Sequence, residues 1–132
     1  MNNDTPTRPS NHEKHKKISD ALAAISAGKR MVVVQEKHLS SDLDELSIES
    51  EELWSVMGIL VKEIQDCGPE KCYAGCHPPT RSYEPEIRDE ELWAYSWPSA
   101  HFGFQMYIKF VMRQNATGEW VYLHLRVHRD ET

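Results

Sequence analysis

An alternation of apolar and polar residues near the carboxyl end, over residues 104–113 and 120–128, is the clearest pattern in the chain. Alternation at every second position predicts two β-strands, each with one apolar and one polar face. The segment between them offers Asn115 and Gly118 for the positive φ angles of a hairpin turn. We therefore expect a long antiparallel hairpin, whose buried face comprises Phe104, Met106, Ile108, Phe110, Met112, Val121, Leu123, Leu125 and Val127.

Helical spacing dominates the amino-terminal half of the chain. Apolar residues recur every three or four positions over about 12–27 and about 51–65, which predicts two amphipathic helices. Residues 31–36 and 92–97 predict further strands, and 40–46 predicts a short helical turn. The chain is therefore expected to be an α+β protein, in which amino-terminal helices pack on an antiparallel sheet of roughly four to six strands that ends in the long hairpin.

The length of 132 residues fits a single hydrophobic core. Residues 1–11 are polar and without periodicity and are expected to form a disordered arm, which leaves 12–132 as one domain. No apolar run is long enough for a membrane span or a signal peptide. We therefore expect a cytoplasmic protein without a membrane partner.

The polar face of the predicted hairpin is unusually rich in groups that bind anions or transfer protons. Its eight side chains are Gln105, Tyr107, Lys109, Arg113, Tyr122, His124, Arg126 and His128. The net charge of −6 comes from the middle of the chain, where residues 31–91 hold five Lys/Arg and fifteen Asp/Glu, so it does not argue against a local basic face. Cleavage of RNA through its own 2′-hydroxyl needs a proton acceptor, a proton donor and cations near phosphorus. This face offers all three.

A cluster of possible zinc ligands interrupts the long loop that follows the second helix. Cys67, Cys72, Cys76 and His77 are groups that Zn²⁺ binds, although their spacing differs from the paired knuckles of most structural zinc sites. The alternative is that the thiols pack the loop against the core. Three cysteines in an apparently intracellular chain do not indicate a disulfide framework. We favour a protein without a metal or other cofactor.

Several segments, in order, resemble the motility quorum-sensing regulator (MqsR) toxins of bacterial type II toxin–antitoxin systems, which have the RelE-like ribonuclease fold. The similar segments are ISDALAAISAG, DELSIESEELWSVMGIL, LWAYSWP and FQMYIKF, within residues 18–130. The resemblance implies a RelE-like domain over 12–132 and a toxin that cleaves mRNA and is neutralised by a cognate antitoxin. The reaction would be a metal-independent acid–base cleavage. A non-catalytic interaction protein of the same fold, with or without a zinc-stapled loop, is the alternative.

The resemblance also assigns individual residues. Tyr107 and Lys109 match the tyrosine and lysine of the family's strand, and His128 or Arg129 matches a basic residue near the end of the last strand. Two further family positions, a lysine and a glutamine, hold alanine at 74 and 94. Catalysis would then rest on Tyr107, His124, Arg126 and His128, or be lost. RNA binding would rest on Gln105, Lys109, Arg113, Tyr122 and Arg129.

Overall fold

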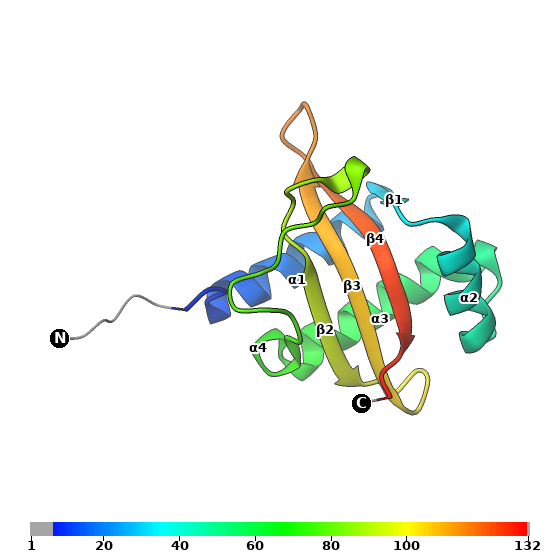
Figure 1. Cartoon of the computed structure of the whole chain (residues 1–132). Helices are drawn as coiled ribbons and strands as arrows, with labels where there is room; N and C mark the ends of the chain where they lie inside the picture. The colour runs from blue at the N-terminus through cyan, green and yellow to red at the C-terminus, as the bar shows by residue number, and fades with distance from the viewer. Residues whose placement is uncertain (1–6, 132) are drawn as a thin grey trace.

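The computed structural model describes residues 7–131 and arranges them as helices packed on one side of a four-stranded sheet (Figure 1). The elements, in chain order, are α1 (Asn11–Ser26), β1 (Arg30–Val32), α2 (Glu36–Leu46), η1 (Ser50–Glu52), α3 (Leu53–Cys67), α4 (Pro69–Cys72), η2 (Pro85–Ile87), β2 (Trp93–Pro98), β3 (Gln105–Gln114) and β4 (Trp120–Arg129). The α+β prediction and the carboxy-terminal hairpin are confirmed. Among the described residues, no helix has the length and apolar character that crossing a membrane requires.

The strands lie in the order β1-β4-β3-β2. β2, β3 and β4 are antiparallel to one another, but β1 runs parallel to β4, with Arg30 opposite Tyr122. The prediction of a wholly antiparallel sheet is therefore wrong at this edge. Most of the chain, including three helices, lies between β1 and β4, so no tight turn forces them to run antiparallel.

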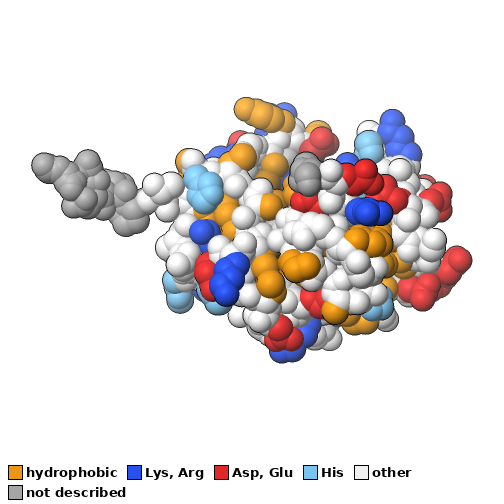
Figure 2. All heavy atoms as spheres, turned by 90° about the horizontal axis from the view of Figure 1, so that it is seen from below, with side chains coloured by type: hydrophobic (Ala, Val, Ile, Leu, Met, Phe, Trp, Pro, Cys, Tyr) orange, Lys and Arg blue, Asp and Glu red, His pale blue; other side chains and the backbone are white. Residues whose placement is uncertain are grey.

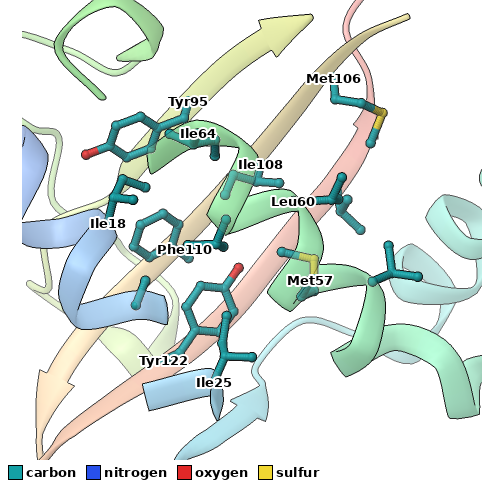
Figure 3. Packing of buried hydrophobic residues seen from close by; sticks show 14 of the residues in the cluster. Ile18, Ile25, Met57, Leu60, Ile64, Tyr95, Met106, Ile108, Phe110 and Tyr122 are labelled. Atoms are coloured by element: carbon teal, nitrogen blue, oxygen red, sulfur yellow. The ribbon is translucent and has the colours of Figure 1, made fainter. Parts of the chain in front are cut away.

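The main core lies between the helices and one face of the sheet. Figure 3 shows side chains from α1 and α3 meeting those of β2, β3 and β4. The labelled residues, all buried, are Ile18, Ile25, Met57, Leu60, Ile64, Tyr95, Met106, Ile108, Phe110 and Tyr122. The helical stripes predicted from the sequence supply the helix side of this core.

The start of α1 is held by local hydrogen bonds. The Ser10 hydroxyl accepts from the backbone N–H of Glu13 at 3.1 Å, and the Glu13 carboxylate accepts from the N–H of Ser10 at 3.0 Å, which forms a capping box. The Arg8 guanidinium bonds to Glu13 and, across the fold, to Glu91. Residues 8–10 are thus attached to the domain, and residues 1–6 of the expected arm lie outside the described residues.

A β-bulge in β4 reverses the alternation predicted for the hairpin. Lys109 pairs with Arg126, but the next pair is Phe110 with His124, so Leu125 has no partner of its own. Between the bulge and the turn, even-numbered residues of β4 therefore face the helices. The prediction that Tyr122 and His124 lie on the open face is wrong for this reason.

The apolar residues of the same half-strand occupy the opposite face of the sheet from the one predicted. Leu123 and Leu125 pack with Val111 and with Ile87 of η2 in a second buried cluster, against which Val121 is partly buried. In Figure 1 the segment between α4 and β2 crosses this face near the hairpin turn. The sheet is therefore covered on both faces near the turn, and on the helical face alone toward the other end of β3.

α2 is longer than the predicted helical turn and covers the edge of β4 beyond β1. There the backbone N–H groups of Val127 and Arg129 donate to the carboxylates of Asp42 at 3.2 Å and Glu45 at 3.3 Å. Because a buried backbone donor without an acceptor is costly, these carboxylates replace the carbonyl groups of a neighbouring strand.

Candidate functional site

Four polar side chains of the hairpin gather on the sheet face opposite α1 and α3. They are Tyr107, Lys109, Arg126 and His128, here called the sheet-face cluster. Tyr107 pairs with His128 across β3 and β4, and Lys109 pairs with Arg126. The cluster lines an open hollow of about 400 Å³, which Ala74 and Asp130 complete. This part of the predicted site is brought together by the fold.

Tyr107 and His128 form a pair of complementary proton-transfer groups. Their rings stack with centroids 4.9 Å apart and planes inclined by 25°. His128 Nδ1 lies 2.9 Å from the carbonyl oxygen of Arg129. Because a carbonyl only accepts, Nδ1 carries a hydrogen, so Nε2 is the acceptor atom of the neutral imidazole. Burial raises the pKa of Tyr107, so its phenol keeps its proton at neutral pH and can donate it.

Arg126 is held in place from the edge of the sheet. Its guanidinium donates to the two carboxylate oxygens of Asp42 at 2.9 and 2.8 Å. Asp42 is only 2% exposed, whereas the Arg126 side chain is 36% exposed. The hydrogen bond to Asp42 is the main cause of the raised pKa of Arg126. The guanidinium therefore has a fixed position, and the carboxylate offsets part of its charge.

Tyr122 and His124 lie outside this cluster, in the core. Tyr122 stacks on Phe110 at a centroid distance of 5.0 Å, and its hydroxyl lies 3.1 Å from His124 Nδ1. His124 Nε2 is buried without a hydrogen-bond partner among the described residues. Burial lowers the pKa of His124 to about 4, so the ring is neutral at pH 7. His124 therefore has no access to RNA, and neither does Tyr122.

The other residues predicted to bind RNA are dispersed. Gln105 is exposed on the same face as the cluster and donates to the Ser96 hydroxyl at 3.0 Å. Arg113 lies near the hairpin turn and donates to the carbonyl of Glu86 at 3.0 Å. Arg129 pairs with Met106 and so lies on the helical face of the sheet, where its guanidinium is 4.8 Å from the ring centroid of Phe104. Only Gln105 therefore adjoins the cluster, and His128 rather than Arg129 accompanies Tyr107.

A second feature of this face was not predicted. Lys109 and Arg126 also line a hollow of about 180 Å³ toward the connection between β1 and α2. A third hollow of about 220 Å³ shares four residues with the second. We call these two hollows the side groove, lined by Val33, Val34, Gln35, His38, Glu84, Pro85 and Glu86. Val33, Val34 and Gln35 belong to residues 31–36, which were predicted as a strand, but β1 ends at Val32 and α2 begins at Glu36. The strand prediction is therefore wrong beyond Val32, and neither alternation nor helical spacing gave a signal for a groove.

The predicted alternative of a zinc site is not supported. Within residues 7–131, no group of three or more His, Cys, Asp or Glu side chains is placed to hold a metal ion. Cys67 and Cys76 are exposed, while Cys72 is buried in the core. The His77 ring instead meets the edge of Tyr73 at a centroid distance of 5.3 Å. Cys72 thus has the packing role considered as the alternative.

Charges of both signs are mixed on the face of the molecule that is seen from below. Seen from below, acidic and basic side chains are interspersed, with hydrophobic side chains between them (Figure 2). An anionic ligand would therefore be attracted by local cations, and the sheet-face cluster supplies two of them.

Comparison with known proteins brought no match, whether among family models, curated proteins or solved structures.

Proposed function

We propose that this protein is a toxin-type endoribonuclease that cleaves mRNA at the sheet-face cluster, with a RelE-like fold and a relationship to the MqsR toxins. The observation that carries the proposal is the stacked Tyr107–His128 pair in a hollow that Lys109 and Arg126 also line. Helices on one sheet face and a long terminal hairpin with an open end agree with that fold. A cognate antitoxin would neutralise the toxin by covering the open face.

The cluster supports a reaction in which the 2′-hydroxyl of RNA is the nucleophile. His128 Nε2 accepts the 2′-hydroxyl proton as the oxygen forms a bond to phosphorus. The bond from phosphorus to the 5′ oxygen breaks, and the Tyr107 phenol gives its proton to that oxygen. Lys109 and Arg126 stabilise the negative charge that develops on the phosphorus oxygens. The products are a 2′,3′-cyclic phosphate and a 5′-hydroxyl.

Cleavage of a single-stranded RNA by the purified protein tests the proposal. His128→Ala and Tyr107→Phe should each lower the rate by about 10²–10⁴-fold, as expected for loss of a general acid or base. His12→Ala is the matched control, because it removes an exposed imidazole from α1 and should leave the rate unchanged. An inactive wild type would refute the proposal, and wild-type rates in both cluster variants would place the reaction elsewhere.

A non-catalytic interaction protein is the second candidate, and three features favour it. Ala74 lines the hollow at a position where the resemblance implies a lysine. Ala94 of β2, which pairs with Lys109 of β3, is buried at a position where the resemblance implies a glutamine. Asp42 offsets the charge of Arg126. This candidate predicts that the wild type binds RNA or a protein partner without cutting RNA. The cleavage experiment therefore separates the two.

A further inference from the structure

The sheet-face cluster continues sideways into the side groove. Lys109 and Arg126 line both the cluster's hollow and the nearer part of the groove. The nearer and farther parts of the groove then share Val33, Val34 and Glu84 as common walls. The three hollows therefore adjoin one another in a row on this face, here called the path, and the reaction proposed above uses only its first part.

The chemistry of the path changes along its length. The part next to the cluster carries two cations, Lys109 and Arg126, and has the exposed His38 at its side, while Glu84 is its acidic residue. The far part has no cation among its lining residues: it shares half-buried Val33 and Val34 and Glu84 with the near part, and adds Pro85 and Glu86. Carboxylates repel a phosphate, so a second phosphate is disfavoured there. An apolar surface beside a hydrogen-bond acceptor suits the flat face and the amino edge of a base.

We propose that the side groove binds the base of the nucleotide next to the phosphate held by Lys109 and Arg126, and that it favours a base with an exocyclic amino group. This inference rests on the proposed function, because it takes single-stranded RNA as the ligand. Adenine, cytosine and guanine each carry an amino group that Glu84 can accept from, whereas uracil has none. The groove thus selects sequence beside a cluster that binds the backbone.

A neighbouring aromatic side chain supports RNA as the occupant. Tyr83 directly precedes Glu84 in the chain and is 91% exposed, which is rare for so large an apolar ring. Aromatic rings on a surface that binds single strands stack on bases with little regard to sequence. Tyr83 is one residue from the groove in the chain and lines neither part of it, so we expect it to add affinity for a further base, while Glu84 contributes selectivity.

Binding of short RNAs that cannot be cleaved tests the inference without requiring catalysis. Labelled single-stranded RNA tetramers with a 2′-deoxy sugar at the nucleophilic position are titrated by fluorescence anisotropy, with the bases on either side of the central phosphate varied in turn. At one position, the wild type should bind adenine, cytosine or guanine about tenfold more tightly than uracil, as expected for a hydrogen bond to a charged group. Glu84→Gln should abolish this preference, because an amide also donates to uracil. Tyr83→Ala should weaken all sequences about fivefold or more and keep the preference.

Glu51→Gln is the matched control, since it neutralises an exposed carboxylate on η1 and should change nothing. Equal binding of all four bases by the wild type would overturn the inference, and so would an unchanged preference in Glu84→Gln. If the wild type still cleaves ordinary RNA in either case, the proposed function survives. If it neither binds nor cleaves RNA, both fail.

Discussion

Protonation of His124 should make the protein sensitive to mild acid. The imidazole is fully buried beside Tyr122, and Trp54 meets its ring edge-on at a centroid distance of 6.2 Å. Its Nε2 has no protein partner among residues 7–131. A charge placed there has no solvent and no carboxylate in direct contact, so the folded state resists protonation. The perturbation is a fall in pH from 7 to 5, applied to the wild type and to His124→Gln.

The expected loss of stability follows from the pKa in the two states. The ordinary pKa is 6.5, and burial, reinforced by Arg126 and partly opposed by Asp42, lowers it in the folded chain to about 4. Between these values the unfolded chain binds more protons, so the free energy of unfolding falls as the pH is lowered. The contribution is complete above about pH 7 and lost by about pH 4. It amounts to roughly 3 kcal/mol in all, of which about 2 kcal/mol is lost between pH 7 and pH 5.

Urea unfolding followed by tryptophan fluorescence at the two pH values measures this loss. The wild type should lose about 2 kcal/mol more than His124→Gln, because glutamine does not titrate and every other group is common to both proteins. An NMR titration of the imidazole should show the same low pKa directly. Equal losses in the two proteins, or a His124 resonance that titrates near its ordinary pKa, would refute the argument from burial.

Three further perturbations concern stability and ligand binding. Asp42→Ala leaves Arg126 and a β4 backbone donor without their acceptor and should lower the free energy of unfolding by about 2–4 kcal/mol in urea titrations. Asp44→Ala, at an exposed position of the same helix, should cost less than about 0.5 kcal/mol. Glu63→Ala removes the acceptor of the Trp97 indole and the Ser99 hydroxyl, so it should lower the free energy of unfolding by about 1–3 kcal/mol and reduce the Tm. An unchanged Tm would show that water replaces the carboxylate. If RNA binds at the cluster, Lys109→Ala should reduce the slope of log affinity against log salt by about 0.7, and an unchanged slope would exclude a phosphate contact there.

Elements with a strong period could be predicted from the sequence, and departures from the period could not. The helices around Ile18 and Leu60 follow apolar stripes that the core buries, so their positions were predictable. β4 alternates without interruption, and nothing local indicates the bulge at Leu125. The one hint in the sequence that this face is covered was Val111, an apolar residue on the polar face of β3. Val111 is buried because Ile87 covers that face.

The candidate site was predictable only where alternation continues undisturbed. Tyr107 and His128 lie on the far side of the bulge from the turn, and there the predicted face is the observed one. His124 lies on the other side and is buried. The side groove was missed because its walls come from segments far apart in sequence, such as Val34 and Glu84, and only tertiary packing brings them together.

The carboxylates of α2 also determine how another molecule can approach this sheet. Where β4 passes beyond β1, Asp42 and Glu45 already accept the backbone hydrogens of Val127 and Arg129. An incoming strand would find these donors taken and two negative charges in its path, so the sheet cannot be extended by β-pairing along this stretch. Along this stretch, the groups left for another molecule to contact are therefore side chains of the sheet face rather than these two backbone donors.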